Sequence, residues 1–193
     1  CGDCPFIVPL LCAFHDEHVL TPSKSGAYLV FPYYARGDMT TWLRTSSPSV
    51  CHVRQVLKCV LHALSFLHEH GIVHCDLKPQ NVLIDDACNG LLCDFEGAVD
   101  CGERTLRLIS QTMKVGTQAF MAPELRPAFD GKKVHPSPAS DMFSFGVLVQ
   151  DVFGALDGVC MPAEVHSICA ACVSEHPRDR PTARQVLTHK WFL

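Results

Sequence analysis

The longest regular pattern of hydrophobic residues lies in the stretch SVCHVRQVLKCVLHALSFLHEHG, residues 49–71. Hydrophobic residues recur there at intervals of three and four, which is the spacing of one face of an α-helix. The residues of this face are Val53, Val56, Leu57, Val60, Leu64 and Leu67. Gly71 follows them, and glycine is typical of the position just past a helix end. The pattern predicts a long amphipathic helix that stops at Gly71.

Four other segments carry helical spacing. In the segment 36–44, the residues Met39, Trp42 and Leu43 recur at i, i+3 and i+4, which predicts a short helix. Three more helices are predicted near the C-terminus, over residues 140–153, 163–176 and 182–192. The last of them begins at Thr182, a residue type that is favoured as an N-cap.

Strand patterns occupy the remaining apolar segments. FIVPLLCAF (6–14) and AYLVFPYY (27–34) flank a polar loop with Pro22 and Gly26, which predicts two antiparallel strands. IVH (72–74) and VLID (82–85) are short predicted strands, and Asn89-Gly90 turns the second back into LLCDF as a hairpin. From Glu96 to about Met121 no period persists, and a connection of that length is typical of functional segments.

Composition narrows the class of protein. A chain of 193 residues with 48% hydrophobic and 19% charged residues predicts a single globular domain. The net charge of -4 argues against a general binder of nucleic acid or anionic membranes. The longest uninterrupted apolar runs fall short of the roughly 20 residues that a membrane helix needs. We therefore expect neither nucleic acid nor a membrane as partner. Because the chain starts at Cys1, inside an apparent strand, we also expect it to be part of a longer protein.

The chain contains twelve cysteines, including the C-x-x-C pairs Cys1/Cys4 and Cys169/Cys172. The second pair lies on the apolar stripe of the helix predicted over residues 163–176, so these thiols are expected in the core. This predicts free cysteines in a reducing compartment, namely the cytoplasm, with the nucleus as the alternative. A zinc or redox module built on the two pairs is the competing interpretation.

Candidate chemistry centres on HCDLKPQNVLID, residues 74–85. Its first eight residues resemble the H-R-D-L-x-x-x-N catalytic loop of protein kinases. CDFEG (93–97) then resembles the metal-binding D-F-G, and GTQAFMAPEL (116–125) the A-P-E segment. SDMFSFGVL and DRPTARQVLTHKWF resemble two helices of the kinase C-lobe, and YLVFPYYARGDM its hinge region. Several motifs in the right order are specific, so the chain resembles the protein kinase family over nearly its whole length.

The resemblance implies an α+β fold with a mainly helical C-lobe and the last strands and hinge of an N-lobe. In this interpretation residues 1–193 form a partial kinase domain, with 1–34 as the remnant of the N-lobe and hinge and 35–193 as the C-lobe. The L-K-P-x-N form of the loop is similar to serine/threonine kinases. The expected function is transfer of the ATP γ-phosphate to a protein hydroxyl.

In phosphoryl transfer the protein mainly positions the reacting groups and neutralises their charge. By the resemblance, Asp76 is the catalytic base and Lys78 places a cation on the transferring phosphate. Asn81 and Asp94 supply oxygen ligands for Mg²⁺, which favours hard oxygen donors. Thr117 matches the threonine that contacts the catalytic Asp and Lys. The implied cofactors are ATP and Mg²⁺, and the implied partner is a protein substrate. The oligomeric state stays open.

The same resemblance assigns a nucleotide pocket. Phe31 takes the gatekeeper position, and the hinge follows it with Pro32, Tyr33 and Tyr34. Asp38 is placed near the ribose, and Leu83 and Met39 beneath the adenine.

Other residues take structural roles in this comparison. His74 and Phe95 are expected to stack in a hydrophobic column below Leu10. Asp141 is expected to bind backbone amides of the catalytic loop. Glu124 and Arg180 are expected to form a buried ion pair.

The sequence departs from the family pattern at several places. It contains no glycine-rich loop and no V-A-I-K lysine. Cys75 replaces the Arg of H-R-D, and Glu96 replaces the Gly of D-F-G, where Gly97 follows. Only 39 positions separate Asp141 from Arg180, too few for an additional docking helix. These departures keep open a second hypothesis, a pseudokinase or scaffold that acts through protein contacts.

Overall fold

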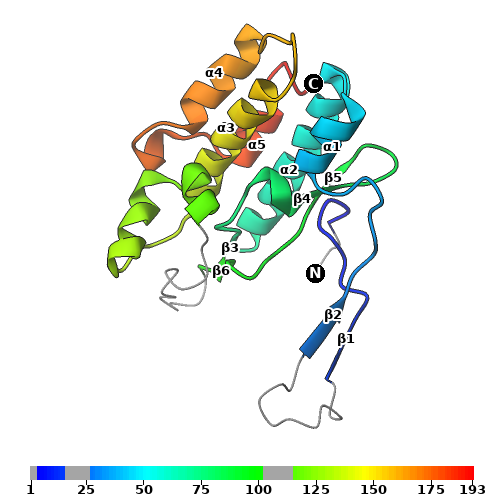
Figure 1. Cartoon of the computed structure of the whole chain (residues 1–193). Helices are drawn as coiled ribbons and strands as arrows, with labels where there is room; N and C mark the ends of the chain where they lie inside the picture. Colours follow the sequence, from blue (N-terminus) through cyan, green and yellow to red (C-terminus); the bar gives the residue numbers. More distant parts are fainter. Residues whose placement is uncertain (1–3, 16–26, 102–114) are drawn as a thin grey trace.

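The computed structural model describes residues 4–15, 27–101 and 115–193. Its helices form one body, and a two-stranded hairpin projects from that body (Figure 1). The α-helices are α1 (Met39–Ser46), α2 (Val50–Glu69), α3 (Pro138–Gly154), α4 (Ala163–Cys172) and α5 (Ala183–Leu187). Short 3-10 helices are η1 (Pro79–Asn81), η3 (Val115–Phe120), η4 (Pro123–Asp130) and η5 (Pro177–Asp179).

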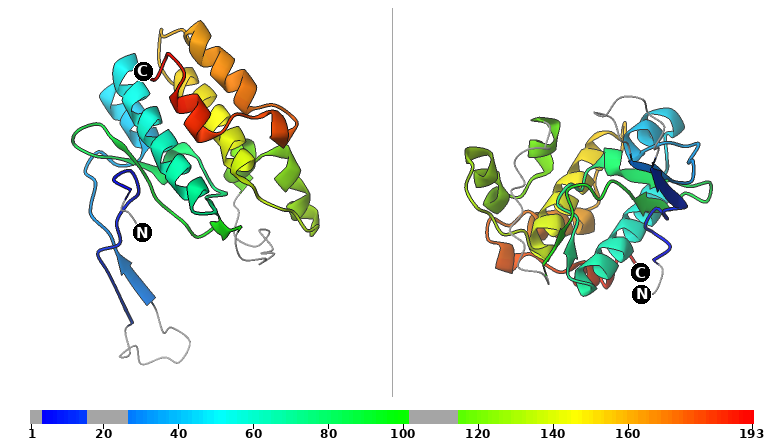
Figure 2. Two further views of the ribbon diagram at one scale, coloured as in Figure 1. Left: turned by 180° about the vertical axis from the view of Figure 1, so that it is seen from behind. Right: turned by 90° about the horizontal axis from the view of Figure 1, so that it is seen from below.

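Helix α2 lies at the centre of the core, where it packs against α5 and the strands β3 (Ile72–Val73) and β5 (Gly90–Leu92). Its predicted apolar face is buried, from Val53 at its start to Leu67 near its end. Helix α3 packs on α2 and, on another side, on α4, and the two further views in Figure 2 show the same arrangement. By length and composition α2 would also fit a membrane, but 50% of its apolar window is buried inside the protein, as in an ordinary core helix.

Side-chain caps explain where the helices begin. The Asp38 carboxylate accepts a hydrogen bond from the N–H of Thr41 at α1, and Ser49 accepts one from His52 at α2. At α5, Thr182 and Gln185 form a capping box, as the predicted N-cap required.

Two predicted helices end earlier than expected. Helix α4 ends at Cys172, because the following turn offers the carbonyl of Ser174 to Arg180 at 2.8 Å. Helix α5 ends at Leu187, and turns then bring Trp191 and the buried Phe192 back onto the core. Long-range contacts therefore override the helical spacing at both ends.

The first predicted strand divides into two parts around Pro9. Residues before it run beside β5, where the N–H of Val8 donates to the carbonyl of Leu92 at 2.9 Å. Residues after it form β1 (Cys12–His15), which pairs antiparallel with β2 (Ala27–Val30) in the predicted hairpin. Both strands are shorter than predicted, and β1 begins only at Cys12 because the residues before Pro9 run beside β5.

The remaining strands hold the functional loops together. Strand β4 (Val82–Ile84) forms the predicted hairpin with β5. Strand β3 (Ile72–Val73) pairs with β6 (Val99–Asp100), a strand that the sequence pattern did not predict. Residues 74–81 therefore connect β3 to β4, and residues 93–98 connect β5 to β6. These two connections lie side by side because the strands at their ends are paired.

The connection between α3 and α4, residues 155–162, contains no helix. This agrees with the short spacing between Asp141 and Arg180 in the sequence. In the described part of the chain, α4 is thus the first helix after α3.

Candidate active site

The catalytic loop brings Asp76, Lys78 and Asn81 together. The Nζ of Lys78 lies 2.6 Å from Oδ2 of Asp76. The Nδ2 of Asn81 donates to the same Oδ2 at 3.0 Å and to the backbone carbonyl of Asp76 at 2.8 Å. The other carboxylate oxygen, Oδ1, is buried and has no hydrogen-bond partner among the described residues. One oxygen of Asp76 is thus held firmly, and the other keeps its capacity to accept a hydrogen bond.

The turn after β5 lies against this loop. The N–H of Cys93 donates to the carbonyl of Asn81 at 3.0 Å, which places Asp94 beside Asn81. A Cβ added at Gly97 would lie 3.8 Å from the Cβ of Asp76. Asp94 itself has a φ of 61°, in the left-handed region that non-glycine residues seldom adopt. Such backbone positions are often found at functional sites.

Asp141, at the start of α3, holds the beginning of the catalytic loop. Its side chain is fully buried, and it accepts hydrogen bonds from the backbone N–H groups of His74 and Cys75, both at 2.9 Å. Cys75 also has a positive φ, of 65°, so these bonds stabilise a backbone geometry that carries a steric cost. This is the arrangement that the resemblance predicted for Asp141.

His68, at the end of α2, completes this network. Its Nε2 lies 2.9 Å from Oδ2 of Asp141. No sequence motif predicts the role of His68, because its partner lies 73 residues away and no local pattern connects the two.

The ring of His74 links the loop to the turn at Asp94. Its Nε2 lies 3.0 Å from the carbonyl of Cys93, and its Nδ1 accepts from the N–H of Asp76 at 3.3 Å. The His74 and Phe95 rings have centroids 5.0 Å apart. Leu10, which was expected above them, is 52% exposed. The described residues therefore contain the lower part of the expected column only.

Cys75 places a buried thiol at the position where the H-R-D pattern has a positively charged arginine. Its sulfur lies 3.6 Å from the carbonyl of Val73, and burial, with the nearby Asp141 carboxylate, raises the pKa of the thiol. The group stays neutral at physiological pH and offers no charge to pair with a phosphate.

Glu124 and Arg180 form a bidentate ion pair, with distances of 2.7 and 2.8 Å. The guanidinium also donates to the carbonyls of Ala139 and Ser174. Burial raises the pKa of Glu124, but hydrogen bonds from Arg180 outweigh it, and the net pKa lies below its usual range. The pair joins η4 to the start of α3 and to the turn that follows α4.

A cavity of about 750 Å³ opens between the hairpin and the turn at Asp94. Its volume lies in the range of about 300–1,000 Å³ that is usual for ligand pockets. The lining residues are Val8, Leu29, Phe31, Leu83, Cys93, Asp94, Phe95 and Glu96. Of the residues assigned to the nucleotide, Phe31 and Leu83 are among them.

The other residues assigned to the nucleotide pocket do not line this cavity. Tyr33 is 91% exposed, and Met39 is fully buried in the helical core. The Oδ1 of Asp38 accepts the hydrogen bond that caps the start of α1. Pro32 and Tyr34 lie on the segment that connects β2 to α1, and partial burial raises the pKa of Tyr34. Thr117 lies within η3, and its side chain is outside the described part of the structure.

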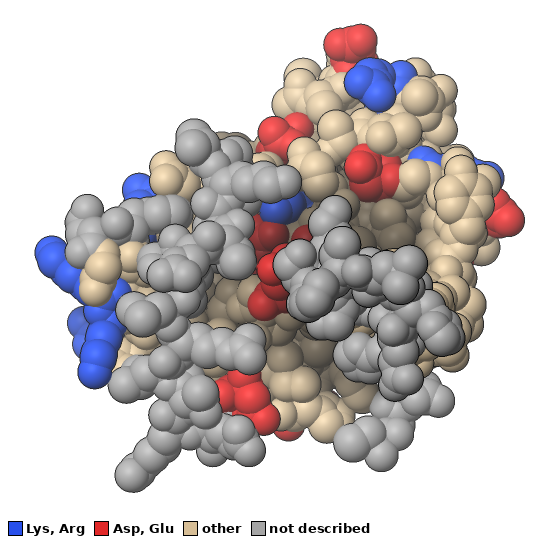
Figure 3. Space-filling model, turned by 60° about the horizontal axis from the view of Figure 1, so that its bottom comes forward, with Lys and Arg blue, Asp and Glu red and all other residues tan. Residues whose placement is uncertain are grey.

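Several lining residues were not predicted from the sequence. Val8 comes from the segment beside β5 and Leu29 from β2, and neither carries a local signal beyond strand spacing. Cys93 flanks Asp94, and that position could have identified it. Burial, together with the charge of Asp94, raises the pKa of Cys93 to about 11. In Figure 3, which views this end of the molecule, acidic groups gather near the centre of the face and most basic groups lie toward its edges.

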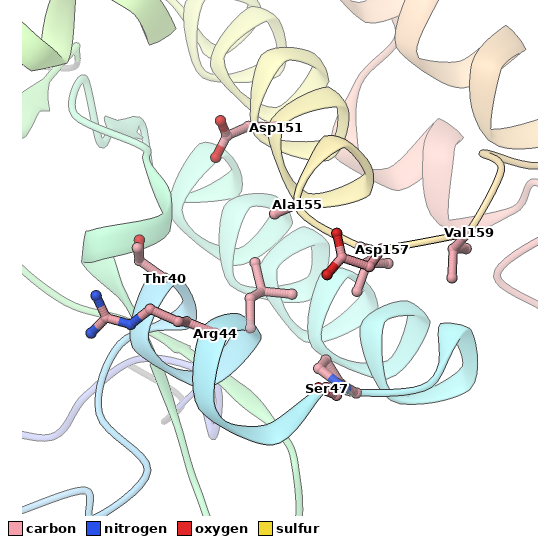
Figure 4. Close-up of a pocket in the computed structure, with 10 residues that line it drawn as sticks. Thr40, Arg44, Ser47, Asp151, Ala155, Asp157 and Val159 are labelled. Carbon is pink, nitrogen blue, oxygen red and sulfur yellow. The ribbon is translucent and has the colours of Figure 1, made fainter.

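A second cavity, of about 560 Å³, lies between α1 and the C-terminal end of α3. Asp151 and Asp157 line it on one side, and Thr40 and Arg44 on the other (Figure 4). None of the residues assigned to catalysis lines it.

The described cysteines are free, and Cys169 and Cys172 are buried in the core, as their place on the apolar stripe predicted. Among the described residues, no three His, Cys, Asp or Glu side chains are grouped to hold a metal ion. Cys1, a member of the other C-x-x-C pair, lies outside the described residues.

Similarity to known proteins identifies the family. The sequence matches the protein kinase domain over residues 1–156. The chain belongs to the protein kinase family. This membership confirms the predicted α+β kinase fold.

Several of the similar curated proteins are named serine/threonine-protein kinases. The chain is 32% identical to serine/threonine-protein kinase VHS1 of Saccharomyces cerevisiae over 147 residues, 68% of this chain and 30% of that protein. It is 28% identical to serine/threonine-protein kinase WNG1 of Toxoplasma gondii over 98% of this chain and 27% of that protein. It is 36% identical to the cAMP-dependent protein kinase catalytic subunit of Dictyostelium discoideum over 75% of this chain and 20% of that protein. The match thus spans less than a third of each of these relatives.

Proposed function

We propose that this protein is a serine/threonine protein kinase that transfers the γ-phosphate of ATP to a hydroxyl of a protein substrate. The single observation that carries the proposal is the state of Asp76. Its Oδ2 is held by Lys78 and Asn81, while its buried Oδ1 has no partner among the described residues. A carboxylate oxygen left in this way is suited to accept the hydrogen of an attacking hydroxyl.

In the proposed reaction the substrate hydroxyl oxygen forms a bond to the γ-phosphorus. The bond between that phosphorus and the β–γ bridging oxygen breaks, and ADP leaves. The proton of the hydroxyl passes to Oδ1 of Asp76. General base catalysis of this kind contributes about 10²–10⁴ in rate. Lys78, 19% exposed beside Asp76, places its charge where the transferring phosphate carries negative charge.

The residues present fit a divalent cation. Mg²⁺, when bound with ATP, neutralises charge on the phosphates and orients them. Asn81 uses its Nδ2 on Asp76, which leaves its Oδ1 as a ligand, and Asp94 offers a carboxylate on the adjacent turn. Amide and carboxylate oxygens are the donors that Mg²⁺ prefers, and its other ligands are usually phosphate oxygens and water.

The adenine base is assigned to the cavity that is lined by Leu29, Phe31 and Leu83. These side chains are apolar, as the faces of the base require. The hinge role that the resemblance assigns to the backbone of residues 32–34 is part of this proposal.

A second candidate function is a scaffold of the pseudokinase type. The observations that favour it are the buried neutral thiol of Cys75 and the additional carboxylate of Glu96 beside Asp94. In this alternative the protein folds as a kinase and acts through its surface without phosphate transfer.

The deciding experiment is Mg²⁺-dependent transfer of labelled phosphate from ATP to a general protein substrate. The full chain is compared with Asp76→Asn, and with Asp86→Asn as a control at a side chain that is 98% exposed. We expect transfer by the wild type and by the control, and a loss of about 100-fold or more with Asp76→Asn at an unchanged thermal midpoint. Equal activity of Asp76→Asn would remove Asp76 from the mechanism. Absence of transfer by the folded wild type would favour the scaffold.

A further inference from the structure

His68 is a largely buried residue that the proposed reaction does not use. It lies in the last turn of α2 with its side chain 10% exposed, and its Nε2 lies 2.9 Å from Oδ2 of Asp141. We propose that His68 is a positioning residue, which fixes the carboxylate of Asp141 and thereby the backbone that places Asp76 for phosphate transfer. This inference rests on the proposed function, because it assigns His68 a part in the same reaction.

The carboxylate of Asp141 binds two consecutive backbone N–H groups with different oxygens. The N–H of His74 donates to Oδ2 and the N–H of Cys75 donates to Oδ1, both at 2.9 Å. Both bonds form together only when the plane of the carboxylate directs its two oxygens at the loop. Rotation about the last torsion of an aspartate is broad and is not confined to narrow wells. The additional bond between His68 and Oδ2 restricts that rotation.

His68 is also the one side chain among the described residues that forms a hydrogen bond or ion pair with Asp141. The side chain of Asp141 is fully buried, so water does not solvate its charge. Cys75 and Cys101 lie near it, but burial and the charge of Asp141 raise the pKa of both thiols, which stay neutral. The imidazole of His68 therefore supplies a stabilisation of this carboxylate that no other described side chain provides.

The backbone that these bonds hold carries a steric cost. Cys75 has a φ of 65°, in the left-handed region that is unfavourable for a residue with a Cβ. Asp76 follows directly, and its N–H donates to Nδ1 of His74 at 3.3 Å. When the carboxylate of Asp141 is free to rotate, residues 74–76 can relax from this geometry, and the carboxylate of Asp76 moves with them. A displacement of about 1 Å at a reacting group can cost about 100-fold in rate.

The test compares three substitutions of His68 in the full chain. His68→Leu removes the donor, and His68→Gln carries an amide that can donate to the same oxygen. His68→Asn carries the same amide on a side chain that is one methylene shorter and does not reach it. Glu69→Gln is the control, at an exposed neighbour on the same helix.

The first readout is steady-state transfer of phosphate from ATP with Mg²⁺, which gives kcat and the KM for ATP. We expect His68→Leu and His68→Asn to lower kcat roughly tenfold, because Asp76 is misplaced. The KM for ATP should change less than about twofold, since His68 does not line the cavity assigned to the nucleotide. His68→Gln should recover most of kcat, and Glu69→Gln should equal the wild type.

The second readout is amide hydrogen exchange without nucleotide, which tests the geometry independently of activity. His68→Leu and His68→Asn should speed exchange at the N–H groups of His74 and Cys75 roughly tenfold, because their acceptor is loosened. The N–H of Ile84 donates to the carbonyl of Gly37, outside this network, and its exchange should not change. Thermal unfolding identifies the variants that are folded at the assay temperature. If His68→Leu does not fold, the comparison of His68→Asn with His68→Gln decides.

The two readouts separate this inference from the proposed function. If the wild type transfers phosphate and the folded His68 variants keep its kcat, the inference is wrong and the proposed function stands. Unchanged exchange at His74 and Cys75 would also contradict the inference, as would a His68→Gln variant no better than His68→Asn. If the folded wild type transfers no phosphate, the proposed function fails, and with it the part assigned to His68 in catalysis.

Discussion

Asp141 and Cys75 lie 66 residues apart in the chain, and the N–H of Cys75 donates a hydrogen bond to Oδ1 of Asp141 at 2.9 Å. The second oxygen of the same carboxylate binds the N–H of His74 and the ring of His68. The start of α3, the end of α2 and the catalytic loop are thus joined at one fully buried carboxylate. The geometry of the loop depends on this group as much as on its own residues.

Replacing Asp141 by Ala should destabilise the protein strongly. The change leaves two backbone N–H groups and the His68 ring without their acceptor, and each unsatisfied buried group costs about 1–3 kcal/mol. We expect a loss of about 3–5 kcal/mol in the free energy of unfolding, measured by urea denaturation. Asp157→Ala, at an exposed carboxylate, is the control. A loss below about 1 kcal/mol for Asp141→Ala would contradict the assigned role of this carboxylate.

Replacing Arg180 by Met should cost about 3–5 kcal/mol of stability, because Glu124 then lacks its cation and several carbonyls lack their donor. Lys190→Met is the matched control, since the Lys190–Glu164 pair lies at the surface, with side chains 71% and 39% exposed. Urea denaturation of both variants at neutral pH measures the difference. An equal effect of the two changes would show that the Glu124–Arg180 pair contributes no more to the free energy of unfolding than the exposed pair does.

The same pair predicts how stability depends on pH. The folded-state pKa of Glu124 lies below its ordinary value of 4.5. Its contribution to stability is therefore complete above that value and is lost as the pH falls through the folded-state pKa. Glu124→Gln should reduce the slope of stability against pH in this acidic range, measured by urea denaturation at a series of pH values. An unchanged slope would mean that the pKa of Glu124 is the same in the folded and the unfolded state.

Gly146 lies where α3 packs against α4. A Cβ at this position would lie 2.8 Å from the Cβ of Cys172 and 2.9 Å from Cγ1 of Val173. Gly146→Ala should therefore force the helices apart and cost about 1–3 kcal/mol. Gly154→Ala is the control on the same helix, because nothing lies within 4 Å of its Cβ. That change should be neutral or should stabilise the helix by up to about 1 kcal/mol. Thermal midpoints of the two variants should thus move in opposite directions, or only the first should move.

Cys93 should react slowly with alkylating agents. Burial and the charge of Asp94 raise its pKa to about 11, so little thiolate exists at neutral pH. We expect iodoacetamide to modify the exposed Cys51 first, and the rate at Cys93 to keep rising as the pH approaches 11, as followed by mass spectrometry. Asp94→Asn should lower that pKa and speed the reaction. Rapid modification of Cys93 at neutral pH would contradict this assignment.

Local spacing in the sequence determined much of this protein. Hydrophobic residues at helical intervals predicted α1 and α2 closely, and Asn89-Gly90 predicted the β4–β5 hairpin. The loop residues Asp76, Lys78 and Asn81 lie within six positions of one another, so a short motif was enough to identify them. The family prediction, which the match to the protein kinase domain confirms, depended on such motifs occurring in the right order.

The tertiary structure decided what local spacing cannot encode. His68 reaches Asp141 across 73 residues, and the unpredicted strand β6 exists because β3 pairs with it. Val8 lines the cavity beside Asp94 because the segment before Pro9 runs along β5, Leu29 reaches the same cavity from β2, and Met39 stays in the core because α1 packs there. Helical and strand periods report only which face of a segment is apolar. Which segment covers that face, and which polar atoms meet there, depends on packing between residues far apart in the chain.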